Sequence, residues 1–267
     1  MFDYAAPKNF PPSSRNPRGV GKHPHRGMET VTMAFQGQVE HQDSTGKHGV
    51  IQEGDVQWMS CGRGIEHSEF HSKEFSKQGG TFEMMQLWVN LPKKNKMNKP
   101  RYQPILAKNI PSVVLSETCS TSTDNDESGS TTGTATEQAH ARVIAGELLG
   151  TTGPAKTYTP VNLWDMVLPN KKTIVDIPYP PDHTAMIFVR RGKVSVDGKT
   201  LGPQDVGILS DSGDAIRVEV LQKNSAIVIM GGEPIDEPIA HMGPFVMNTR
   251  EELQQAVLDY RNGRFGK

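Results

Sequence analysis

The sequence has 267 residues and a formal net charge of −1, with two cysteines, Cys61 and Cys119. This length is enough for one large domain or two ordinary domains with buried cores. The balanced charge gives no overall positive field that would attract nucleic acid or lipid, and no run approaches 18 apolar residues, so we expect no membrane helix. Two cysteines are too few for a disulfide framework, which favours a reducing intracellular compartment.

The first half of the sequence reads as short strands separated by turns. Strand-like runs occupy residues 30–42, 49–60 and 80–92. The last of these alternates, which places every second side chain on one face: Phe82, Met84, Gln86 and Trp88. A spacing of roughly ten residues per strand favours an antiparallel sandwich or barrel.

Two polar segments interrupt this pattern. Residues 92–104 are basic and bounded by prolines, and we interpret them as a solvated loop, with a nuclear-import or anion-binding patch as the alternative. Residues 117–138 are rich in serine and threonine and lack large apolar side chains. Such a segment cannot bury enough surface to offset its ordering entropy, so we predict a disordered insertion.

The second half repeats the strand pattern and then changes character. Residues 35–60 and 189–210 show the same succession of strands and glycine turns, which indicates one β-barrel unit used twice. We therefore predict a first unit over residues 1–116, the insertion at 117–138 and a second unit over 139–267. The second unit would end in an amphipathic helix that begins after a cap at Asn248 or Thr249 and ends near Gly263. Its apolar stripe would consist of Leu253, Ala256, Val257 and Tyr260.

Two pairs of potential metal ligands stand in the first unit. His23 and His25 occupy i and i+2 positions of an extended stretch and so point to the same side, and His67 and Glu69 repeat that relation. On strands of one small barrel the pairs would converge as three imidazoles and a carboxylate. The alternative is a set of surface or hydrogen-bonded histidines. These ligand types suit Fe(II), Mn, Ni or Cu better than Mg or Ca, and four of them leave two octahedral positions open.

Other residues near these pairs are not predicted to be metal ligands. Glu29 has the same nominal face as His25 and is a candidate to orient a ligand imidazole, with a strand-end salt bridge as the alternative. We interpret Trp58 as packing and Cys61 as a small buried side chain rather than a fifth ligand. In the second half His183 and His241 are isolated, so that unit is predicted to hold no metal.

Several long motifs carry a family resemblance. The stretches HPHRGMETVT, GVIQEGDVQWMSCGRGIEHSE, QLWVNLP and GEPIDEPIAHMGPFVMNTREEL resemble the pirin family, bicupins of the cupin superfamily. The resemblance spans nearly the whole chain apart from the polar insertion. It implies an all-β fold of two tandem, jelly-roll-like cupin barrels with a short C-terminal helix. It also implies a single non-haem Fe(2+) ion held by His23, His25, His67 and Glu69. The family normally has further residues before a segment like MFDYAAP, so we expect a fragment or a first barrel with an unpaired edge.

The resemblance implies two functions of different kinds. One is an iron-dependent quercetin 2,3-dioxygenase, an oxidoreductase that opens a flavonol-like small molecule with O₂ and releases carbon monoxide. The other is a redox-sensing transcriptional coregulator that binds a protein partner. A structural bicupin with an empty site is a third possibility. We expect no direct binding of nucleic acid or membrane, a monomeric state, and a location in the cytoplasm, the nucleus or both.

Overall fold

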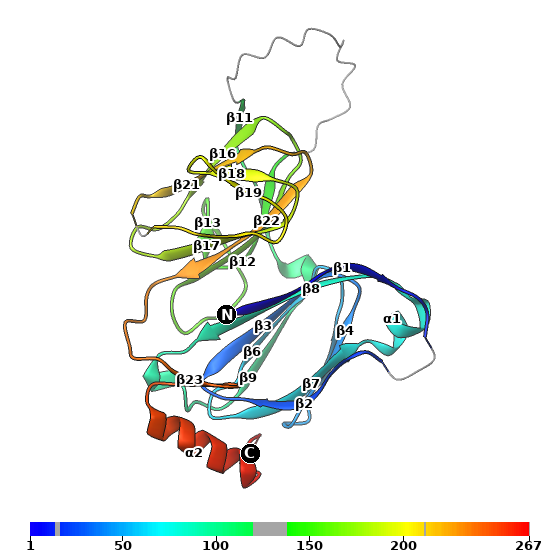
Figure 1. The fold of residues 1–267 in the computed structure, drawn as a ribbon, viewed down its shortest axis with the longest axis vertical. Coiled ribbons are helices and arrows are strands. Elements are labelled where there is room, and N and C mark those ends of the chain that lie inside the picture. Colours follow the sequence, from blue (N-terminus) through cyan, green and yellow to red (C-terminus); the bar gives the residue numbers. More distant parts are fainter. Residues whose placement is uncertain (14–16, 120–137, 211, 267) are drawn as a thin grey trace. The chain divides into compact units, whose positions relative to one another are not determined.

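The computed structural model describes residues 1–13, 17–119, 138–210 and 212–266 (Figure 1). Contacts divide the chain into two compact units. Met1–Asn109 and Ile235–Lys267 form the first unit, and Ile110–Pro234 form the second. In the described residues no helix is long and apolar enough to span a membrane.

The first unit contains two antiparallel sheets. The five-stranded sheet consists, in spatial order, of β1 (Phe2–Phe10), β8 (Gly80–Asn90), β3 (Met28–Gln36), β6 (Val56–Ser60) and β9 (Arg101–Ile105). The four-stranded sheet consists of β2 (Gly19–His25), β7 (Ile65–His71), β4 (Val39–Asp43) and β5 (His48–Ile51). A core cluster draws on both sheets, from Ala34, Val39, Ile51, Phe75 and Phe82. The two sheets therefore bury their apolar faces against each other.

Short helices and a two-stranded hairpin complete this unit. They are α1 (Lys73–Gln78), the 3₁₀ turns η1 (Lys93–Asn95) and η2 (Ala107–Asn109), the hairpin of β23 (Ala240–Met242) and β24 (Phe245–Met247), and α2 (Arg250–Arg261). Lys96 departs from the solvated loop predicted for residues 92–104. Its side chain is buried, and its Nζ donates to the Gly27 and Val246 carbonyls and to Asn90 Oδ1. These three oxygens replace the water that the ammonium group loses, so its burial is tolerated.

The second unit repeats the two-sheet arrangement. One sheet consists of β10 (Ser112–Val114), β12 (His140–Ala145), β15 (Val161–Leu168), β22 (Ser225–Gly232), β17 (Thr184–Arg191) and β20 (Val206–Ile208). The other consists of β11 (Glu117–Cys119), β16 (Thr173–Pro178), β21 (Ala215–Val220), β18 (Val194–Val196) and β19 (Lys199–Leu201), and a separate hairpin joins β13 (Glu147–Leu148) to β14 (Thr151–Thr152). One apolar cluster, which includes Trp164, Val175, Ile187 and Val218, spans both sheets. The predicted all-β fold with a repeated unit is confirmed.

The unit boundaries differ from the predicted ones at three places. Residues 110–116, predicted in the first unit, group with the second. Residues 235–267 group with the first unit rather than with the second, because Arg26 pairs with Phe245 and Asp259, contacts that local sequence patterns do not show. Of the predicted insertion 117–138, Glu117–Cys119 form β11, which pairs with β16. Residues 120–137 lie outside the described residues.

The predicted C-terminal helix is present as α2. Thr249 is its N-cap, and its hydroxyl accepts from the Glu252 backbone N–H while the Glu252 carboxylate accepts from the Thr249 backbone N–H. This reciprocal capping box satisfies two backbone donors at the helix start. Leu253 and Ala256 are buried as expected, whereas Tyr260 is partly exposed.

Replacing Thr249 with alanine removes the cap, so the free energy of unfolding should fall by about 1 kcal/mol. Urea denaturation measures the change. Thr249→Ser keeps the hydroxyl and should be close to the wild type, and Gln254→Ala, at an exposed position of the same helix, is the control. Equal stability of the alanine and serine variants would contradict the capping role.

Candidate metal centre

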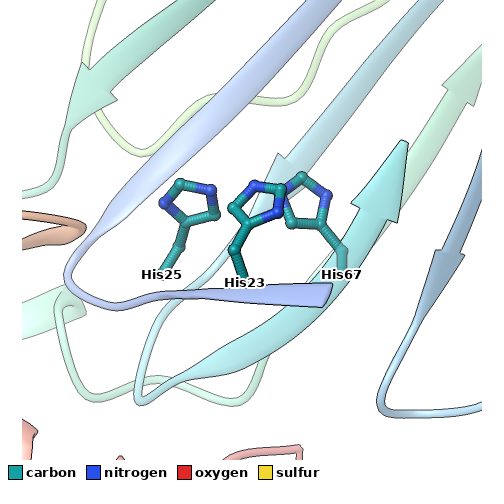
Figure 2. A group of neighbouring side chains, drawn as sticks. All are labelled: His23, His25 and His67. Carbon is teal, nitrogen blue, oxygen red and sulfur yellow. The ribbon is translucent and has the colours of Figure 1, made fainter. Parts of the chain in front are cut away.

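The pairing of β2 with β7 brings three histidines together. His23 lies directly opposite His67 in the antiparallel register, and His25 follows on the same face of β2. The ring centroids are 4.3 Å apart for His23 and His67 and 4.9 Å apart for His25 and His67. Figure 2 shows the three rings on the same side of the two strands. One ligand nitrogen from each ring lies within 4.8 Å of the others, a grouping that could hold a metal ion.

A tight turn before β7 sets the position of His67. Gly62 has a φ of +48°, and a Cβ at this position would lie 2.1 Å from the Asn98 carbonyl oxygen. Only glycine fits such a conformation and such a close backbone approach. This turn directs the chain into β7 in the register that His67 needs.

Glu69 lies beside this cluster, two residues after His67 on the same face of β7. Its Oε2 is 3.9 Å from His67 Nε2, and Glu69, His67 and His41 form a second grouping that could hold a metal. Burial raises the pKa of the Glu69 carboxyl, while hydrogen bonds from Gln86 and Thr32 and the nearby His23 act in the opposite direction. The structure thus brings the four predicted residues into two overlapping groups that share His67.

Burial keeps two imidazoles of the cluster, those of His25 and His67, neutral. Burial, followed by the charge of His23, lowers the pKa of His25 to about 3, and burial also lowers the pKa of His67 strongly. Both ring nitrogens of His25 and Nε2 of His67 are buried without a hydrogen-bond partner. His23 Nδ1 lies 2.8 Å from the Gly21 carbonyl oxygen, so it carries the proton and leaves Nε2 as the free lone pair. Neutral imidazoles with unpartnered nitrogens are the form that binds a metal.

Two polar side chains of the opposite sheet hold the carboxylate. Gln86 Nε2 on β8 donates to Glu69 Oε1 and Oε2 at 2.9 and 2.8 Å, and Thr32 Oγ1 on β3 donates to Oε1 at 3.2 Å. Trp88, also on β8, packs edge-on against His25 with the ring centroids 5.2 Å apart. The alternation of residues 80–92 predicted that Gln86 and Trp88 share a face, but it did not identify either as part of the site.

Sequence reasoning also missed His41, which is fully buried on β4. Its Nδ1 lies 3.4 Å from His67 Nδ1, and it is opposite Glu69 in the register of β4 and β7. The available signal was its i, i+2 relation to Asp43, the same spacing that joins His67 to Glu69.

Glu29 does not lie with the histidines. On β3 it is Thr32 that contacts Glu69, and Glu29 is three residues away in the strand and therefore on the opposite face. Its carboxylate accepts a hydrogen bond from Ser60 Oγ, and burial raises the pKa of this carboxyl. The expected shared face was wrong because the chain turns at Arg26–Gly27 between β2 and β3, which interrupts the alternation.

The remaining predicted residues lie apart from the cluster. Trp58 is fully buried, and Cys61 packs with Met59 and Ile65 in a small apolar cluster where burial raises the pKa of its thiol. His183 is within 3.4 Å of the Asn162 side chain in the second unit. Among the described residues, both groupings of potential metal ligands lie in the first unit.

Two facing sheets used twice, with a histidine cluster enclosed in the first copy, define a bicupin with a candidate metal centre. The family model Pirin matches residues 1–89, and the model for the Pirin C-terminal cupin domain matches residues 163–266. A protein of Pseudomonas aeruginosa, provisionally named a quercetin 2,3-dioxygenase, is 44% identical over 265 residues, which cover 99% of this chain and 85% of that protein. The chain belongs to the pirin family.

Solved structures agree with this assignment. The crystal structure of quercetin 2,3-dioxygenase from Acinetobacter baumannii has a TM-score of 0.87 at 44% identity, covering 100% of this chain and 85% of that one. The bacterial pirin YhhW from Escherichia coli, in complex with nickel(II), has a TM-score of 0.60 at 22% identity, with coverages of 87% and 80%. At this lower identity the likeness supports the fold alone.

The lowered pKa of His25 predicts acid sensitivity of the metal-free protein. The unfolded chain takes up a proton near pH 6.5 that folded His25 takes up only near pH 3, so stability is lost as the pH falls through this window. Between pH 6.5 and pH 3 the free energy of unfolding of the wild type should therefore fall more steeply than that of His25→Gln, by up to about 1.4 kcal/mol per pH unit. Urea denaturation of metal-free protein at several pH values measures this, with His140→Gln in the second unit as the control. Parallel curves for wild type and His25→Gln would contradict the prediction.

Proposed function

We propose that His23, His25, His67 and Glu69 hold one iron ion and that the protein is a dioxygenase that cleaves flavonols such as quercetin. The observation that carries the proposal is the convergence of three imidazoles beside the Glu69 carboxylate. Of the three, His25 and His67 are buried and neutral and have ring nitrogens without a hydrogen-bond partner. A cluster of this kind is costly to bury unless something binds its lone pairs, because an unsatisfied buried polar atom loses its hydration without compensation.

The donor set fits a first-row transition metal. Three imidazoles and one carboxylate suit Fe(II), Ni(II) or Mn(II), whereas Mg²⁺ and Ca²⁺ prefer oxygen ligands. Iron is the member of the group that we propose for dioxygen chemistry.

The protein groups around the centre have separate tasks. When bound, the metal supplies Lewis-acid polarisation of a substrate carbonyl or hydroxyl oxygen. Gln86 fixes the orientation of Glu69 by donating to both of its oxygens. In this proposal the Glu69 carboxylate accepts the proton that a flavonol 3-hydroxyl loses on binding, and burial, which raises the pKa of this carboxyl, favours the transfer. Trp88 covers one side of His25 and limits the access of water there.

Replacement of a ligand should abolish metal binding. His23→Ala and His67→Ala remove one ligand each, and each variant should lose bound iron, as measured by elemental analysis of anaerobically loaded protein. His48→Ala is the matched control, because His48 is exposed on β5 and pairs with Glu40 outside the cluster. A His67→Ala variant that keeps one iron per chain would contradict the four-ligand assignment.

The iron-loaded protein should consume quercetin in the presence of O₂. Loss of the flavonol absorbance and release of carbon monoxide measure the reaction, and the His67→Ala variant should be inactive. Persistence of the flavonol in the presence of protein with confirmed bound iron would disprove the dioxygenase proposal but leave the metal site intact.

A further inference from the structure

A second buried histidine reaches the proposed ligand His67 from the strand on its other side. β7 lies between β2 and β4, and His41 on β4 is fully buried. The Nδ1 atoms of His41 and His67 are 3.4 Å apart. Two neutral imidazoles can form such a contact only if one of the two nitrogens carries a proton and donates a hydrogen bond to the other.

The direction of this contact follows from the position of the other His67 nitrogen. His67 Nε2 has no hydrogen-bond partner and lies 3.9 Å from Glu69 Oε2, so it is the atom that faces the proposed metal position. A ligand nitrogen must be unprotonated, and the proton of neutral His67 is therefore on Nδ1. His67 Nδ1 then donates, and His41 Nδ1 accepts.

This assignment places the proton of His41 on Nε2, which faces Asp43. His41 Nε2 and Asp43 Oδ2 are 3.7 Å apart, and both are buried atoms without a hydrogen-bond partner. The other oxygen of Asp43, Oδ1, accepts from the Thr45 backbone N–H, the Thr45 hydroxyl and the Lys47 backbone N–H. Asp43 is thus anchored through one oxygen and presents the other to His41.

The ring of His41 is also fixed from the opposite sheet. Tyr102 on β9 stacks on it, with the ring centroids 5.6 Å apart and an angle of 26° between the planes. His41 therefore differs from His23 and His25, because one of its nitrogens contacts His67 and the other faces a carboxylate. This arrangement suits a group that orients a ligand rather than one that binds the metal itself.

We propose that His41, anchored by Asp43, is a positioning residue that holds His67 in the rotamer and tautomer needed for metal binding. The proposal rests on the metal centre proposed above. Groups that accept the second N–H of a metal-bound histidine fix its ring and raise its basicity, and their loss typically weakens metal affinity about 10–100-fold.

Three variants of His41 test this inference by competition with a metal-binding dye and by the absorption spectrum of the cobalt(II)-loaded protein. His41→Leu removes the acceptor, and its metal dissociation constant should rise about 10–100-fold with a changed cobalt spectrum, while one ion per chain still binds at saturation. The amide oxygen of His41→Asn takes the place of Nδ1, so this variant should bind within a few-fold of the wild type. In His41→Gln the amide reaches the position of Nε2, so its affinity should resemble that of the leucine variant.

The control is His71→Leu on β7, the strand of His67, because the His71 side chain packs against Phe10, Phe75 and Phe82 rather than the cluster. It should keep the affinity and spectrum of the wild type. If His41→Leu does not fold, the comparison of His41→Asn with His41→Gln decides. Equal affinity of those two variants, or wild-type affinity of His41→Leu, would overturn the positioning role. Loss of the bound ion at saturation would make His41 a ligand instead. A wild-type protein that binds no metal would disprove the proposed function itself.

Discussion

The antiparallel register of β2 and β7 is the constraint on which the candidate metal centre depends. His23 lies opposite His67, and the same face of β2 carries His25. A slip of one residue would turn both histidines of β2 to the other face, because the side chains of a strand alternate. The turn at Gly62 directs the chain into this register, and the side chains of the facing sheet then enclose the rings.

Burial gives these residues their chemical character. The same loss of water that keeps His25 and His67 neutral raises the pKa of the Glu69 carboxyl, so burial disfavours the charged form of all three groups. Its unpartnered nitrogens are a cost to the folded state. Binding of a metal to these nitrogens would relieve that cost and would stabilise the folded chain by the excess of its affinity for the folded over the unfolded state. The lone pairs that destabilise the fold without a metal are thus the ones proposed to bind it.

The sequence predicted the parts of the site that lie on one strand and missed those that depend on pairing between strands. His23 with His25, and His67 with Glu69, are visible because i and i+2 positions share a face. His41 and Gln86 reach the same cluster from β4 and from the opposite sheet, and their contacts depend on a strand order that the sequence does not state. Glu29 was assigned to the wrong face because the side-chain alternation of β2 was assumed to continue into β3, whereas the chain turns at Arg26–Gly27.

The return of the C-terminal segment to the first unit has a physical basis at the residue after His25. Arg26 is buried, donates to Asp259 of α2 at 2.8 Å and to the Arg63 carbonyl at 2.7 Å, and lies over the Phe265 ring. A buried ion pair adds little net stability compared with apolar packing, but removal of one partner leaves a buried charge. The ion pair therefore fixes position rather than adding stability, because the Arg26 guanidinium has its hydrogen-bond partners when the end of β2 lies against α2. The adjoining Gly27 has a φ of +80°, and a Cβ there would lie 2.0 Å from the Val246 carbonyl oxygen. The C-terminal helix and hairpin thus hold the strand that carries two of the three clustered histidines, which explains why they pack with the first unit.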